Sequence, residues 1–73
     1  MAMNPEIKMK RTLRKIHDRL KNEPLNSHEL GDVDADLMGL EEYDRVTFQG
    51  KFKYDLRFLR TLTAKLLEMK NGR

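Results

Sequence analysis

The sequence lacks cysteine and tryptophan and has only two prolines and four glycines among its 73 residues. Without cysteine, neither a disulfide framework nor a thiolate metal site can support a small core, and secreted domains of this length normally need such support. Residues 1–7 do not resemble a signal peptide, and no apolar run approaches the roughly 20 residues of a membrane span. These absences predict one cytoplasmic domain over residues 1–73, with no membrane association and with disorder at 1–4 and 71–73.

Charge, in contrast, is abundant and is segregated along the chain. Residues 6–21 hold seven Lys or Arg against two acids, and residues 45–73 hold eight against two. Between them, residues 22–44 hold eight acids and no Lys or Arg. The net charges of the three blocks, in chain order, are therefore +5, −8 and +6, which sum to the overall +3. This segregation indicates interaction surfaces, although an acidic block that packs beside the basic helices and neutralises them is an equal alternative.

The first basic block predicts an amphipathic helix. Residues 4–6 (Asn-Pro-Glu) combine a capping residue, a proline suited to the first helical position and an early acid. Apolar residues then recur at helical spacing as far as about Lys21, opposite a half covered by lysines and arginines. Asn22 and Pro24 should end the helix. The residues predicted to face the core are Met9, Leu13, Ile16 and Leu20.

The acidic block predicts two shorter helices. Residues 26–29 resemble a capping box, and Gly31 would end a very short helix as its C-cap. Asp32 or Asp34 would then cap a third helix that runs to about Tyr43. The apolar residues of this third helix, expected to point inward, are Val33, Leu37 and Leu40.

Residues 45–54 change to a period of two, which predicts a β-hairpin. A three-residue loop at 49–51 would keep the apolar residues on one face and leave Thr47, Lys51 and Lys53 outside. The residues of that apolar face are Val46, Phe48, Phe52 and Tyr54.

Asp55 would cap a final helix that continues to about Met69. This helix is apolar over about half of its circumference, which is wider than one buried face requires. Its apolar residues alternate at spacings of three and four, as in a helix-to-helix seam. A homodimer is therefore expected, the alternative being that the same domain covers both sides. The predicted seam consists of Leu59, Leu62, Leu66 and Met69.

No constellation in the sequence predicts catalysis or a cofactor. Only His17 and His28 are candidates for acid–base catalysis at neutral pH, and neither has a cysteine or a motif-placed serine to activate. The aspartates at 32, 34 and 36 resemble the start of a calcium loop. However, Leu37 and Tyr43 stand where that loop needs glycine and glutamate. We therefore expect a non-enzymatic protein without metal or cofactor.

The expected fold class is mainly α with a β-hairpin (α+β), in the order α-α-α-β-β-α. That order resembles a winged helix-turn-helix domain, with 25–43 as the helix-turn-helix and 46–54 as the wing. The resemblance implies a DNA-recognition helix at 34–43. This segment carries four acids and no base, which argues against its insertion between phosphates.

Two functions follow as hypotheses. The first is a nucleic-acid-binding or transcription-regulatory module that holds the phosphate backbone with little base specificity. Its predicted binding residues are Lys8, Lys10, Arg11, Arg14, Lys15, Arg19, Lys51, Lys53, Arg57 and Arg60. The same cations would also suit an acidic protein surface.

The second hypothesis is a protein-interaction module, such as a phage- or plasmid-type regulator or inhibitor. It would dock on a larger protein through the acidic surface of residues 32–44. The residues predicted to make that contact are Asp34, Asp36, Glu41 and Glu42.

Overall fold

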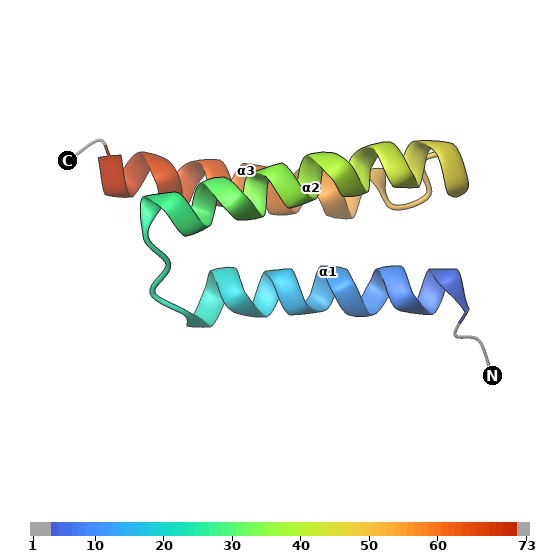
Figure 1. Ribbon diagram of the computed structural model, residues 1–73, viewed down its shortest axis with the longest axis horizontal. Helices are drawn as coiled ribbons and strands as arrows, with labels where there is room; N and C mark the ends of the chain where they lie inside the picture. Colours follow the sequence, from blue (N-terminus) through green and yellow to red (C-terminus); the bar gives the residue numbers. More distant parts are fainter. Residues whose placement is uncertain (1–3, 72–73) are drawn as a thin grey trace.

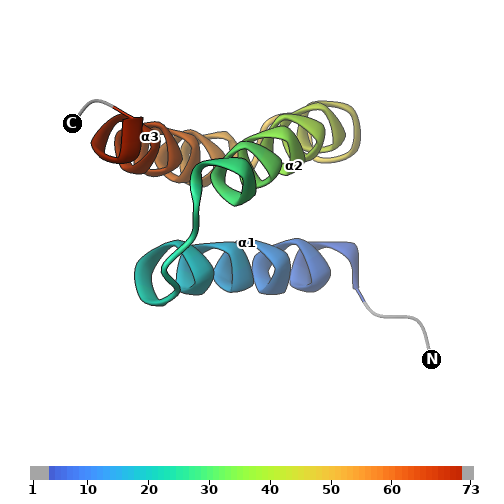
Figure 2. The same ribbon diagram turned by 60° about the vertical axis from the view of Figure 1, so that its left-hand side comes forward.

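The computed structural model describes residues 4–71, except the side chain at 71, and contains three helices and no strand in that range. α1 spans Pro5–Asn22, α2 spans Ser27–Thr47 and α3 spans Lys53–Asn71. α2 and α3 form an antiparallel helical hairpin, and α1 lies along one side of it (Figure 1). Turned by 60°, the molecule shows α1 beneath both helices of the hairpin (Figure 2). None of the helices in residues 4–71 combines the length and the hydropathy that a membrane span requires.

α1 begins and ends where the sequence predicts. The Asn4 side chain accepts a hydrogen bond of 2.8 Å from the backbone N–H of Glu6, and Pro5 occupies the first turn. At the other end, the N–H of Glu23 donates to the carbonyl of Arg19. The predicted core stripe is also confirmed, since three of its residues are buried and the fourth packs against the core. Residues 1–3 and 72–73, for which disorder was expected, lie outside the described residues.

The capping box that begins α2 is confirmed. The Asn26 side chain accepts from the Glu29 N–H at 2.8 Å, and the Glu29 carboxylate accepts from the Asn26 N–H at 2.9 Å. Two backbone donors that would otherwise lack partners at the helix start are thereby satisfied.

The prediction of two separate helices in the acidic block is wrong. α2 continues without a break through Gly31 and Gly39, so Gly31 is not a C-cap and Asp32 and Asp34 cap no further helix. A glycine inside a helix costs about 0.5–1 kcal/mol relative to alanine. Burial of the neighbouring apolar side chains outweighs that cost, at about 1.5–3 kcal/mol for each fully buried residue. The buried apolar residues of α2 are Leu30, Val33 and Leu37.

The predicted β-hairpin at 45–54 is also wrong, and with it the α+β class and the winged-helix order. Residues 45–47 are the last turn of α2, and α3 begins at Lys53. Gln49 and Gly50 adopt left-handed backbone angles, with φ of 55° and 83°, and these end α2. The fold is a three-helix bundle.

The period of two misled because its four residues do not share one environment. Phe52 is buried and Phe48 is half-buried, whereas Val46 is 66% exposed and Tyr54 is 70% exposed. Val46 and Tyr54 lie on different helices that flank the loop. Alternation over so short a segment therefore arose from two helix ends and a turn.

A buried carboxylate holds the connection between α2 and α3. Asp44 is 1% exposed, and its Oδ1 accepts a 3.0 Å hydrogen bond from the backbone N–H of Phe52, just before α3. Its carbonyl accepts from the N–H groups of Phe48 and Gly50. The rings of Phe48 and Phe52 meet edge to face at 5.2 Å, and Tyr43 contacts Phe48 at 5.6 Å. Asp44 thus closes the turn through both its side chain and its backbone carbonyl.

All three helices contribute to the core, but not equally. The side chains of less than 2% exposure lie on α2 and α3: Leu30, Val33, Leu37, Asp44, Leu56 and Thr63. The buried side chains of α1 are slightly more exposed than these: Met9, Leu13 and Leu20. The helical hairpin is therefore the centre of the fold, and α1 covers one of its sides.

Candidate nucleic-acid interface

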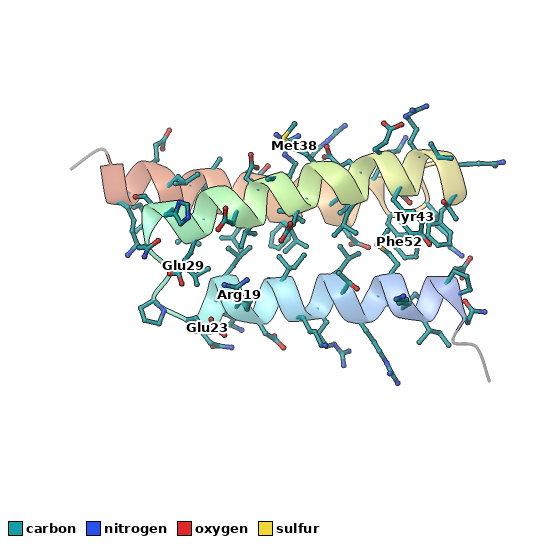
Figure 3. The ribbon with its side chains drawn as sticks, in the orientation of Figure 1. Arg19, Glu23, Glu29, Met38, Tyr43 and Phe52 are labelled. Atoms are coloured by element: carbon teal, nitrogen blue, oxygen red, sulfur yellow. The ribbon has the colours of Figure 1, made fainter. Side chains whose placement is uncertain are left out.

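Most basic side chains of α1 lie at the surface without an ion-pair partner. Arg19 is the exception, since it is half-buried and its guanidinium lies 3.5 Å from the Glu23 carboxylate. Figure 3 labels both side chains, near the carboxyl end of α1. The remaining six are exposed, and none forms an ion pair with another residue in the described range. They are Lys8, Lys10, Arg11, Arg14, Lys15 and Lys21. With a rise of about 1.5 Å per residue, they extend along roughly 20 Å of helix.

Three cations outside α1 are instead paired within the chain: Lys51, Arg45 and Arg60. Lys51 lies 2.7 Å from Glu6, and its hydrogen bond and charge lower the pKa of Glu6. Arg45 pairs with Glu42 one helical turn away. A ligand phosphate would compete with a carboxylate at each of these positions.

Arg60 is paired most extensively. Its guanidinium lies 3.3 Å from Asp34 and 3.0 Å from Glu41, and so bridges α3 to α2. The hydrogen bond to Asp34, followed by the charge of Glu41, raises the pKa of Arg60. Arg57 lines the same groove between α2 and α3. Among the described residues, none from α1 contributes to that groove.

The acids predicted to bind a protein partner are largely engaged inside the chain. Asp34 and Glu41 are half-buried against Arg60, and Glu42 is paired with Arg45. Of the four, only Asp36 forms no ion pair within residues 4–71, and its side chain is exposed.

Six of the ten predicted nucleic-acid-binding residues come together on α1, and the other four do not extend that surface as expected. Lys51 reaches the first turn of α1, but through Glu6. The ammonium group of Lys53 lies 5.2 Å from the centre of the Tyr54 ring. Arg57 and Arg60 line the separate groove described above.

The predicted dimer seam is partly covered by the chain itself. Leu59 is buried, and Leu62 and Leu66 pack against the core. Met69 is 73% exposed. A homodimer through α3 stays a prediction, and Met69 is the seam residue that is most open to a second copy.

A groove between α1 and α3 was not predicted from the sequence. Its volume is about 320 Å³, and its lining consists of Lys10, Leu13, Arg14, His17, Asp55, Phe58 and Leu59. The rings of His17 and Phe58 meet edge to face, with centroids 5.8 Å apart. Phe58 nevertheless remains 58% exposed. Its position at the edge of the apolar arc of the final helix was the available signal.

Comparisons of the chain with protein-family models, curated proteins and solved structures found no match. In residues 4–71, no three His, Asp or Glu side chains are grouped so that they could hold a metal ion. The feature with the clearest chemistry is the exposed cationic surface of α1, defined here as Lys8, Lys10, Arg11, Arg14, Lys15 and Lys21.

Proposed function

We propose that the protein is a non-enzymatic nucleic-acid-binding module that holds the phosphate backbone through the cationic surface of α1. The supporting observation is the division of the charges. The six cations of this surface form no ion pair within the described chain, whereas Lys51, Arg45 and Arg60 do. A phosphate that approaches α1 displaces solvent and counterions rather than an internal carboxylate.

The fold supports backbone binding rather than base reading. The wing that the winged-helix resemblance implied is absent from residues 4–71. Two of the four acids in segment 34–43 hold Arg60. Phosphate contacts by themselves carry no sequence information. Any regulatory role in transcription would therefore depend on occupancy of nucleic acid rather than on a specific base sequence.

The experiment is an anisotropy titration of labelled oligonucleotides at several salt concentrations. We expect log K to fall linearly with log salt, because each phosphate contact releases counterions. The variant Lys8→Gln with Lys15→Gln should bind more weakly, and its salt slope should be smaller by about 2. Circular dichroism would check that this variant and its control remain helical.

The matched control is Lys65→Gln with Lys70→Gln. It removes the same charge from exposed positions on α3 and should retain the wild-type salt slope. Equal loss in the two variants would place the site elsewhere. Salt-insensitive binding, or no binding near 50 mM salt, would refute the proposal. Polyglutamate that binds as tightly as nucleic acid would favour an acidic protein partner instead.

A further inference from the structure

The groove between α1 and α3 brings an exposed aromatic ring next to unpaired cations of α1. Lys10 and Arg14 enter it from α1, and Phe58 enters it from α3. We infer that this groove binds single-stranded nucleic acid, with a base stacked on Phe58 and the flanking phosphates held by Lys10 and Arg14. The inference rests on the proposed function and adds the class of nucleic acid that the protein prefers.

The shape of the groove suits one base and its phosphates. Leu13 and Leu59 are buried and form an apolar floor. The volume of about 320 Å³ is close to the lower end of the range of ligand pockets, roughly 300–1,000 Å³. A flat aromatic group therefore fits, whereas a duplex could only lie across the rim.

Charge at the rim favours an anion. Lys10 and Arg14 contribute two positive charges, and Asp55 contributes one carboxylate. Asp55 forms no ion pair with either cation within the described residues. The rim therefore has a net positive charge, and neither cation is held in an ion pair within residues 4–71.

Phe58 is placed as a stacking surface rather than as a core residue. His17 contacts one part of the ring, at a ring-to-ring angle of 64°, and helps to orient it. More than half of the residue remains exposed. Stacking on an aromatic side chain tolerates every base, because each base has a π face. In a duplex those faces are covered by neighbouring bases, so a single strand is the form that can use Phe58.

The variant Phe58→Trp tests this inference directly, because the native chain contains no tryptophan. Its emission would be followed during titration with a mixed-sequence DNA 12-mer, the corresponding RNA and the DNA duplex. We expect quenching by the single strands and little change with the duplex. The DNA and RNA arms distinguish the two sources of the same single-strand chemistry.

Affinity measurements on alanine variants provide the second test. Phe58→Ala should weaken single-strand binding by roughly 5- to 140-fold and leave duplex binding nearly unchanged. Tyr54→Ala is the matched control, because Tyr54 is another exposed aromatic of α3 but does not line the groove. It should retain wild-type affinity. Lys10→Gln with Arg14→Gln should reduce the single-strand salt slope by about 1.4.

The outcomes separate this inference from the proposed function. Equal binding of duplex and single strand, unaffected by Phe58→Ala, would overturn the inference and leave α1 as a backbone-binding surface. Failure to bind any nucleic acid would remove both. Emission changes with polyglutamate but not with oligonucleotides would assign the groove to an acidic peptide and overturn the inference.

Discussion

α1 and α2 have similar lengths and opposite charge, yet their charges face different surroundings. α1 carries seven cations, six of them without an ion-pair partner in the described chain. α2 carries seven acids, and three of them bind Arg45 or Arg60 while Asp44 closes the turn to α3. The charges of α2 therefore mainly support the fold, whereas those of α1 remain available to a ligand.

The two helices also differ in how deeply they are buried. The core residues of α2 are almost completely inaccessible, whereas those of α1 retain slight exposure. Met38 of α2 points away from α1, on the outer side of the hairpin (Figure 3). We therefore expect α2 and α3 to provide most of the stability. α1 packs on one side of the hairpin and provides an exposed surface.

The largest expected effect tests that division in the core. Leu37→Ala should lower the free energy of unfolding by about 3–5 kcal/mol, because Leu37 is completely buried. Leu13→Ala should cost about 2 kcal/mol, because Leu13 retains 7% exposure. Urea denaturation followed by circular dichroism would measure both. A larger loss for Leu13 would contradict the conclusion that α2 and α3 provide most of the stability.

Next in size is the effect of removing the buried carboxylate. Asp44→Ala leaves the Phe52 N–H without its acceptor and should cost about 1.5–3 kcal/mol. Asp44→Asn keeps an acceptor oxygen and should cost less. Asp36→Ala removes an exposed, unpaired acid of the same helix and should change stability by less than about 0.5 kcal/mol. Equal effects at 44 and 36 would contradict a special role for Asp44.

The glycines of α2 give a smaller effect of opposite sign. Gly31→Ala and Gly39→Ala should each raise the free energy of unfolding by about 0.5–1 kcal/mol. Apart from the chain neighbours and the nearby backbone of the helix itself, an added Cβ meets no heavy atom of the described chain within 4 Å at either site. Gly50→Ala should be destabilising, because its φ is 83°. Thermal denaturation would measure all three. Destabilisation by Gly31→Ala is the result expected if Gly31 ended a helix, and it would contradict a continuous α2.

The smallest effect concerns the pairing of Glu6 with Lys51. Because the Lys51 hydrogen bond lowers the pKa of Glu6, the pair stabilises the fold above the ordinary carboxyl pKa of 4.5. That contribution is lost as the pH falls through the lower pKa of the folded state. An NMR titration of the Glu6 carboxyl should show its pKa rising toward 4.5 in Lys51→Met. An unchanged pKa in that variant would show that the ion pair does not form in solution.

Local signals in the sequence predicted α1 and the start of α2 correctly. Asn4, Pro5 and the capping box act on backbone groups within three residues, so the helix starts can be predicted without tertiary structure. The β-hairpin could not be excluded in this way. The turn that replaces it depends on the burial of Asp44 and on its contact with Phe52, eight residues away.

Of the candidate sites, the basic face of α1 was predictable and the groove was not. Helical spacing already separated the cations of α1 from its apolar stripe. The groove requires Phe58 to lie against His17, which only the packing of α3 on α1 establishes. Neither residue has a neighbour in the sequence that would indicate this contact.

Charge and periodicity are local properties, so a basic helix at each end and an acidic block between them could be predicted from the sequence alone. Which of the charges remain free depends on how the helices pack. Lys51 meets Glu6 across 45 residues, and Arg60 meets Asp34 across 26. Such pairs form only when packing brings distant segments within about 4 Å, so no local pattern distinguishes a paired cation from one that can bind a phosphate.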